Sequence, residues 1–358
     1  MSSKEPKQAT LPVHGAANLP SVEIVSSNLE LEDEDGFIGD KASKSAFREA
    51  LDDVRSTLRK AGLDPLGKKA SDEISKKKLD AVLAKGDAEA GAVVQSAVET
   101  FAGQLAGVIK RFLRQKSWRG AERIVFGGGF RASRVGELAI ARAGILLKEE
   151  DTDIDFQLIH NDPDEAGLIG AVHLLPPWMV EGYDAILAVD IGGSNIRTGI
   201  VELNLRKAKD LSKACLFDMR LWRHQDEEEV KRDEAVKRMM QMLKTLLSNA
   251  KKSNLLLAPV VGVGCPGIIR EDGAIERGSQ NLPGNWESSK FNLPRAIQND
   301  IPNVGDHETI VVMHNDAVVQ GLSELPYLDD CKRWAALTIG TGLGNASFAR
   351  RKRKVRNA

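Results

Sequence analysis

The sequence predicts an α/β fold of two domains, and three observations support this prediction. The chain has 358 residues, enough for two hydrophobic cores of ordinary size. Short apolar runs typical of strands alternate with amphipathic stretches typical of helices along most of its length. Several apolar runs also end in glycines or acids, which is typical of the strand ends where α/β proteins bind ligands.

In the first half of the chain, apolar spacing of three and four residues predicts helices that end at glycine or proline. Residues 43–58 show this spacing, and Gly62 follows as a stop signal. Residues 87–113 have a continuous apolar face and predict a long amphipathic helix. The other elements predicted here are strands at 22–25, 123–126 and 156–159, a charged loop over 67–78, and helices at 79–83, about 130–147 and 165–174.

The second half is organised around residues 186–201, which read ILAVDIGGSNIRTGIV. An apolar run, an acid, two glycines and a second apolar run predict a β-hairpin with a tight turn. The elements predicted after it are strands at 215–221, 259–264, 273–277, 310–313, 335–339 and 346–348, and helices at 227–250 and 318–324. The tail over 350–356 is almost entirely basic, which is typical of a solvated end.

Composition narrows the class of protein. Lys and Arg total 50 against 51 Asp and Glu, so nothing favours nucleic acid as a partner. No membrane span or signal peptide is expected. Cys215, Cys265 and Cys331 fit no metal-binding or disulfide spacing, so we expect no zinc site and a cytoplasmic location. A homo-oligomer is left open.

The hairpin at 186–201 has the features of a phosphate-binding turn. Gly192 and Gly193 carry no Cβ atom, so a polyphosphate can approach their N–H groups closely. Asp190 precedes them at the end of the apolar run, where it could hold Mg²⁺ or its water shell. The alternative is an ordinary glycine turn beside a solvent-exposed acid.

Three other strand ends share this character. Asn315 and Asp316 follow an apolar strand, and Asp316 there predicts either a general base or a helix cap. Thr341 lies between two glycines in a second predicted turn, where the alternative is an ordinary hairpin. The glycines at 127–129 follow a third strand, and they predict either contact with a ligand or close packing of a helix.

Together these motifs resemble the ROK family of sugar kinases, within the superfamily of actin, hexokinase and Hsp70 ATPases. The resemblance covers most of residues 86–348. Its segments are DIGGSN (190–195), GCPG (264–267), QNLPGNW (280–286), MHNDA (313–317), TIGTGLG (338–344), FGGGF (126–130) and EAGLIGAVHL (165–174).

The resemblance implies a two-domain actin-like ATPase fold, also called ribonuclease H-like, in circularly permuted form. The family normally begins with the DIGG hairpin and ends with the GGG strand, whereas here the GGG strand comes first. One domain would then combine residues 1–180 with 320–358, and the other would be the inserted segment 184–318. ATP and sugar would lie in the cleft between them.

The resemblance also implies an activity: ATP-dependent transfer of the γ-phosphate to a hexose hydroxyl, as in glucokinases, at O6. Asp316 would be the general base. Mg²⁺ would be held near Asp190, through water. The residues implied to contact the sugar are Asn315, Gly267 and Asn281. The residues implied to contact ATP are Asp190, Gly192, Gly193, Ser194, Asn195, Thr341, Gly342, Gly127, Gly128 and Gly129.

Two family features are absent from the expected places. These are a Glu-x-Gly-His sugar motif and a Cys-rich zinc loop, for which the permutation leaves only His14, Glu30 and Glu32 as candidates. Their absence favours an alternative, a sugar-sensing regulator that keeps the fold without turnover. A further alternative is an ATPase scaffold without sugar specificity. No helix-turn-helix pattern of the kind found in the family's repressors is recognised.

Overall fold

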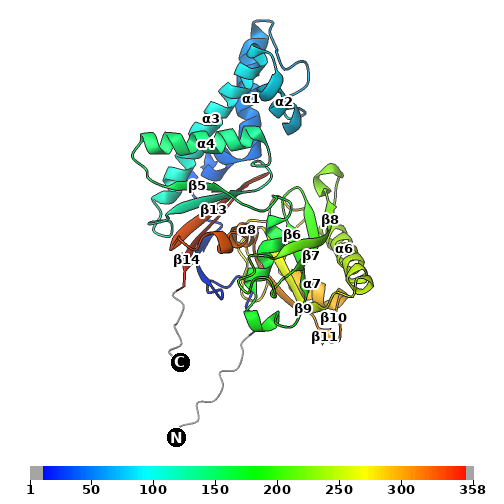
Figure 1. Ribbon diagram of the computed structural model, residues 1–358. Helices are drawn as coiled ribbons and strands as arrows, with labels where there is room; N and C mark the ends of the chain where they lie inside the picture. The colour runs from blue at the N-terminus through cyan, green and yellow to red at the C-terminus, as the bar shows by residue number, and fades with distance from the viewer. Residues whose placement is uncertain (1–10, 352–358) are drawn as a thin grey trace.

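The computed structural model describes residues 11–351. The polar first ten residues and most of the predicted basic tail lie outside this range. Within it, two five-stranded mixed sheets lie side by side, and helices cover their outer faces (Figure 1).

The first sheet is built around the predicted hairpin. The strands β6 (Ala185–Ile191), β7 (Ile196–Glu202) and β8 (Cys215–Trp222) pair in antiparallel order. On the other side of β6, the strands β9 (Leu257–Cys265) and β12 (Ile310–Asn315) run parallel to it. All seven residues of β6 are buried, as expected of a central strand covered on both faces.

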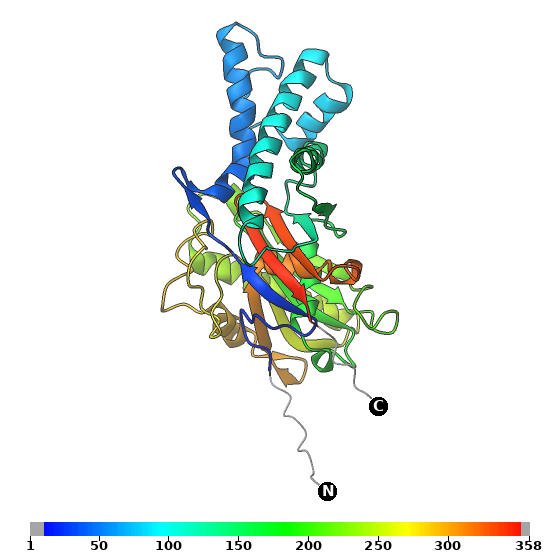
Figure 2. The same cartoon turned by 90° about the vertical axis from the view of Figure 1, so that its left-hand side faces the viewer.

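The second sheet has the same layout. Its antiparallel strands are β13 (Arg333–Ile339), β14 (Leu343–Arg350) and β1 (Val22–Ser27). The strands parallel to β13 are β4 (Arg123–Gly127) and β5 (Asp155–Leu158). Figure 2 shows β1 in blue beside β14 in red, so the two ends of the described chain meet in one sheet.

The two sheets differ in where the chain begins. In the first sheet the central strand and its hairpin partner come first along the chain, and in the second sheet they come last. This cyclic shift is the strand order that a circular permutation would produce. The permutation, as a relationship to other proteins, stays a prediction.

Four helices cover the second sheet and extend away from it (Figures 1 and 2). They are α1 (Lys44–Lys60), α2 (Lys76–Lys85), α3 (Ala88–Leu113) and α4 (Arg134–Glu149). Ser43, Ser75, Asp87 and Ser133 cap their N-termini by accepting backbone N–H groups. These local capping signals explain why most of the predicted helix starts agree with the structure to within a few residues.

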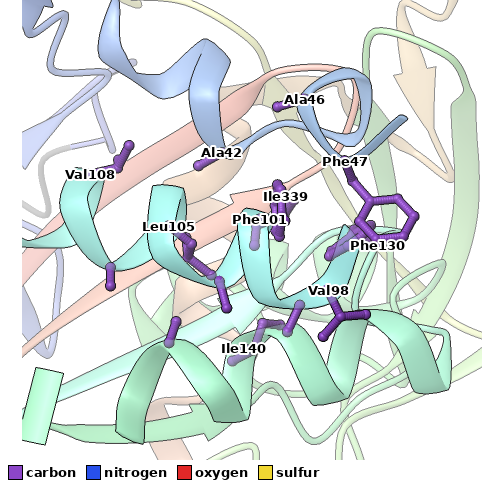
Figure 3. Close-up of a cluster of buried hydrophobic side chains, with 14 of the residues drawn as sticks. Ala42, Ala46, Phe47, Val98, Phe101, Leu105, Val108, Phe130, Ile140 and Ile339 are labelled. Carbon is purple, nitrogen blue, oxygen red and sulfur yellow. The ribbon is translucent and has the colours of Figure 1, made fainter. Parts of the chain in front are cut away.

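The helix α3 is long and apolar enough to span a membrane by length and composition, although no span was expected from the sequence. It contributes twelve buried residues to a hydrophobic core, however, and packs between α1 and α4. Figure 3 shows its side chains meeting those of α4 and of residues around Phe47 and Phe130. The apolar surface of α3 is therefore explained by the core.

The first sheet is covered on its outer side by α6 (Arg232–Lys252) and α7 (Leu293–Asp300). Between the sheets lie two short helices, α5 (Ala166–Gly170) and α8 (Asp316–Leu322), in a separate core. The shorter elements are β2 (Glu32–Asp33), β3 (Gly36–Phe37), β10 (Asn303–Val304), β11 (His307–Glu308) and 3₁₀ turns at Ile38–Ala42, Ala171–Leu174, Pro177–Met179, His224–Asp226 and Leu325–Tyr327.

Some elements differ from the prediction. The expected strand over 273–277 is a loop with one isolated bridge, between Ile269 and Ile275, because Gly273 adopts a positive φ and turns the chain. The expected helix over 165–174 divides into α5 and a 3₁₀ turn. The sequence analysis also missed α7, which is only eight residues long.

One N-terminal segment crosses the predicted division into domains. Gly15 donates its N–H to the carbonyl of Met313 (2.9 Å), and Met313 donates to Nδ1 of His14 (3.1 Å). Residues 14–16 therefore lie along β12 of the first sheet, whereas the prediction placed them with the second. The division of the rest of the chain stays a prediction.

Candidate active site

A cleft of about 740 Å³ lies where the ends of strands from both sheets meet. Four sequence motifs come together on its walls: the turn after β6, the turn after β13, the glycines after β4 and the start of α8. The predicted residues that line it are Asp190, Gly192, Gly193, Ser194, Asn195, Gly128, Gly129, Asn281, Asp316, Thr341 and Gly342. Gly127, Gly267 and Asn315 are not among the residues that line it.

The two glycine turns touch each other across the cleft. Oγ of Ser194 and Oγ1 of Thr341 are 2.7 Å apart and share a hydrogen bond. Each turn is closed by a short backbone bond, from Gly192 N to Asn195 O (2.8 Å) and from Gly340 N to Gly342 O (3.0 Å). The turns therefore form one surface of backbone groups and hydroxyls, of a kind that can bind phosphate.

A 3₁₀ turn that the sequence analysis missed supports the first glycine turn. The buried His224 donates from Nε2 to the carbonyl of Gly192 (2.9 Å), and Gln225 donates its N–H to the carbonyl of Ser194 (3.3 Å). Both bonds hold carbonyl groups of the turn in place. No local signal marks His224, because the contact depends on how β8 returns beside the hairpin.

Asp316 is the first residue of α8, and its half-buried carboxyl group lines the cleft. Burial raises the pKa of Asp316 to about 7, and repulsion from Asp190 adds to this, while its own N–H and that of Ala317 oppose it. A carboxylate of this kind can exchange a proton near neutral pH.

The helix cap is Asn315 rather than Asp316. Oδ1 of Asn315 accepts the N–H groups of Ala317 (3.0 Å) and Val318 (3.3 Å). Its Nδ2 donates to the carbonyl of Gly267 (3.1 Å), and only 2% of the residue is exposed. Asn315 and Gly267 thus hold two strand ends together beneath the cleft, which gives no support to their predicted contacts with sugar. The capping alternative for Asp316 is wrong.

Asp190 is buried, with 2% of the residue exposed, and it is paired with a cation. Nη1 of Arg197, its cross-strand neighbour, lies 3.2 Å from Oδ2 of Asp190. Arg197 also donates to Asp164, which lies in the loop before α5. Burial raises the pKa of Asp190, whereas the positive charge of Arg197 acts to lower it. When the oxygen and nitrogen of its side-chain amide exchange places, Asn195 accepts a hydrogen bond from Nη2 of Arg197 (3.1 Å) and donates one to the carbonyl of Ser194.

We expect Arg197→Leu to destabilise the protein by about 3 to 5 kcal/mol, because it leaves the buried carboxylate of Asp190 unpaired. The double variant Arg197→Leu/Asp190→Asn should recover much of this loss, because its carboxamide is neutral. Denaturant unfolding of the parent, both single variants and the double variant measures the coupling. Additive losses would show that the ion pair is energetically unimportant.

The glycines after β4 allow close approach of two strand ends. Gly128 has a φ of +81°, and a Cβ atom built on it would lie 2.5 Å from the carbonyl oxygen of Ile339. Its N–H donates to Oε1 of Gln320 in α8 (3.2 Å). Nζ of Lys76 donates to the carbonyl of Gly129. Gly128 and Gly129 face the cleft, while Gly127 serves the packing.

The N-terminal segment supplies the opposite end of the cleft. Glu30 and Glu32, predicted as candidates there, line it together with Asn28. The carboxylate of Glu30 lies 3.3 Å from the guanidinium of Arg277. His14, the third candidate, contacts Met313 instead and does not line the cleft.

Besides Asn28, this segment contains two residues that sequence reasoning missed. Phe37 and Asp40 line the cleft, and residues 37–40 read Phe-Ile-Gly-Asp. This shares the glycine and the spacing of the expected Glu-x-Gly-His motif, but it has neither the Glu nor the His. That glycine was the available signal. The cleft therefore has a different set of polar groups from the one the family resemblance implied.

Among residues 11–351, no three His, Cys, Asp or Glu side chains lie close enough together to form a metal site. The absence of zinc stays a prediction, as does Mg²⁺ at Asp190. The cysteines at 215, 265 and 331 are free.

No established family model matches the chain, and no curated protein matches it. Among solved structures it is similar to the ROK hexokinase from Thermus thermophilus, at 17% identity and a TM-score of 0.27 over 37% of this chain and 35% of that one. It is also similar to the Lmo2764 protein from Listeria monocytogenes, provisionally described as an N-acetylmannosamine kinase. The identity is 22% and the TM-score is 0.33, over 48% of this chain and 51% of that one. A third similar structure is the Ppx/GppA phosphatase from Aquifex aeolicus, at 14% identity and a TM-score of 0.35 over 69% of this chain and 88% of that one.

The match spans about a third to a half of the length of the two sugar-kinase structures. TM-scores of this size do not establish the fold, but the strand order does. Two sheets of equal layout, with paired glycine hairpins facing one cleft, confirm the predicted two-domain α/β fold of the actin-like ATPase type.

Proposed function

We propose that the protein transfers the γ-phosphoryl group of ATP to a hydroxyl of a sugar, with Asp316 as the general base. The observation behind this proposal is the carboxyl group of Asp316, with a pKa of about 7, in the same cleft as two touching glycine turns. The carboxyl group would accept a proton, and the surface formed by the two turns would bind phosphate. Phosphoryl transfer to a hydroxyl can use both when they lie in one place.

The chain's own groups have distinct tasks in this proposal. The turns after β6 and β13 present backbone N–H groups and the hydroxyls of Ser194 and Thr341 to the phosphates. Asp316 accepts the proton of the sugar hydroxyl as its oxygen attacks. Mg²⁺ enters with ATP as part of the substrate and neutralises phosphate charge.

The donor set near Asp190 fits a hydrated Mg²⁺ ion. Asp190 and Asp316 both offer carboxylate oxygens in this cleft, and Asp190 lies close enough to raise the pKa of Asp316. Mg²⁺ is usually bound through one or two carboxylates and water. Asp190 would hold it through water, with Arg197 as the alternative counter-ion.

The acceptor is proposed to be a hexose, phosphorylated at O6. Asn28, Glu30 and Glu287 line the cleft and offer the amide and carboxylate groups that bind sugar hydroxyls. Glu287 also accepts from the N–H and hydroxyl of Ser279 (both 2.9 Å), which fixes its position.

A second candidate is a sugar-sensing regulator without turnover. Two observations favour it: the expected Glu-x-Gly-His sugar motif is not found in the sequence, and Arg197 already pairs with Asp190. A regulator would bind sugar without releasing ADP.

A coupled ADP-release assay over a panel of hexoses, with calorimetry for sugar binding, separates the candidates. Sugar-dependent ADP release supports the kinase. Sugar binding without ADP release supports the regulator. ADP release that no sugar stimulates indicates an ATPase scaffold and contradicts both.

Two further expectations belong to this proposal. The cyclic shift of strands in the second sheet supports descent by circular permutation from a kinase of the usual order. The three free cysteines are compatible with the proposed cytoplasmic location.

A further inference from the structure

The loop over residues 278–287 is held rigidly beside the cleft. The side chain of Trp286 is buried and donates from Nε1 to the carbonyl of Pro283 (2.8 Å). Glu287 accepts two hydrogen bonds from Ser279 at the other end of the loop. Leu282, next to the tip, is buried in the core of the first sheet. A residue on this loop therefore has a defined place.

Asn281 lies between the two glycine turns. A Cβ atom built on Gly193 would lie 3.0 Å from Cβ of Asn281, and one built on Gly342 would lie 3.4 Å from its Nδ2. One side chain thus contacts the turn from each sheet, next to the hydrogen bond between Ser194 and Thr341.

The amide of Asn281 is free to bind a ligand. Within residues 11–351 it makes no hydrogen bond, it is exposed, and it lines the cleft. Both of the contacts described above are with glycine turns, the parts of the cleft proposed to bind phosphate. This differs from the contact with sugar that the family resemblance implied for Asn281.

We infer that Asn281 is a catalytic residue that donates a hydrogen bond from Nδ2 to the phosphoryl group being transferred. The inference rests on the proposed function. In that reaction the bond between the γ-phosphorus and the β,γ-bridging oxygen breaks, and a bond from the sugar oxygen to phosphorus forms. The sugar proton goes to Asp316, and ADP leaves with the bridging oxygen. The negative charge on the oxygens of the moving group is what an amide N–H stabilises.

The inference predicts a specific loss of affinity for the γ-phosphate. Asn281→Ala should weaken binding of the non-hydrolysable imido analogue of ATP, with Mg²⁺, by about tenfold to a hundredfold, the usual effect of losing a hydrogen bond to a charged group. Binding of ADP with Mg²⁺ should be unchanged, because ADP has no γ-phosphate. Titration calorimetry measures both affinities on the full chain.

Two variants control the experiment. Asn281→Asp keeps the shape of the side chain but places a negative charge beside the γ-phosphate. It should therefore weaken binding of the analogue more than Asn281→Ala does. Asn285→Ala removes a hydrogen bond to Glu287 N (2.9 Å) in the same loop, and should leave the preference for the analogue over ADP as in the parent.

The outcomes separate the two proposals. Equal losses for ADP and the analogue, or no loss for either, would overturn the role of Asn281 while leaving the kinase proposal intact. Weaker sugar binding with unchanged nucleotide affinities would also overturn it, in favour of a sugar contact. A parent protein that binds neither nucleotide would overturn the proposed function and this inference with it.

Discussion

Asp316→Asn is expected to lower sugar-dependent turnover by about 10²- to 10⁴-fold, the usual contribution of a general base. The carboxamide has nearly the same shape but cannot accept the sugar proton. Nucleotide affinity should change little, because the turns after β6 and β13 are intact. The helix α8 should also persist, because Asn315 caps it.

Steady-state kinetics of the coupled assay, with nucleotide affinity from calorimetry, measure this effect. Turnover within a few-fold of the parent would remove Asp316 from the mechanism. It would also remove the main support for a kinase, because the proposal depends on this carboxyl group as the proton acceptor.

The same residue predicts a pH dependence of activity. Burial raises the pKa of Asp316 to about 7, and only the ionised form can accept a proton. In the parent, kcat/KM for the sugar should therefore rise with pH through about 7. The residual activity of Asp316→Asn should lack this rise, and a profile shared by both proteins would assign the titration to another group.

Stability should respond to pH in the opposite sense. The pKa of Asp316 in the folded protein lies above its unfolded value of 3.8, so the folded state holds this proton more tightly. The resulting stabilisation is complete below about pH 4 and is lost as the pH rises through about 7. Asp316→Asn should therefore gain in melting temperature relative to the parent at pH 8 but not at pH 4.

Gly170→Ala is expected to destabilise the protein by forcing apart the two short helices that lie between the sheets. A Cβ atom built on Gly170 would lie 1.8 Å from the carbonyl oxygen of Val319 and 3.2 Å from the N–H nitrogen of Ser323. Both neighbours are backbone atoms of α8 or its end, so no side chain can move away, and the two helices must separate. Overpacking of this kind costs about 1 to 3 kcal/mol and occasionally more.

Gly103→Ala provides a matched control. Gly103 lies in α3, is exposed, and has open space where the Cβ atom would be. The free energy of unfolding of Gly103→Ala should exceed that of the parent by about 0.5 to 1 kcal/mol, because alanine has lower conformational entropy than glycine in the unfolded chain. Denaturant unfolding of both variants measures the difference. Equal stabilities would show that α5 and α8 do not pack as closely as described.

Gly170→Ala should also lower activity, because α8 begins with Asp316. A shift of this helix moves the proposed base relative to both glycine turns, and displacements of about 1 Å can cost a hundredfold in rate. A destabilised variant with full turnover below its melting temperature would show that the helix position is unimportant for catalysis.

Much of the cleft could be predicted from the sequence because its elements are local. Apolar runs that end at Gly192–Gly193 and at Gly340–Gly342 specify hairpins from neighbouring residues alone. The position of Asp316 after a buried strand placed it at a strand end in the same way. The order of these motifs, compared with their usual order in the family they resemble, anticipated the cyclic shift of the second sheet.

Only the tertiary structure decided which side chains share the cleft. Glu30, Phe37 and Asp40 reach it because β1 pairs with β14 at the other end of the chain. His224 supports the first turn because β8 returns beside β7, and Asn281 reaches both turns because its loop is anchored in a core. Asn315, predicted to contact sugar, is a buried cap. Spacing along the sequence specifies hairpins and caps, but contacts between residues hundreds of positions apart follow from how sheets and cores assemble, for which no short stretch of sequence carries a signal.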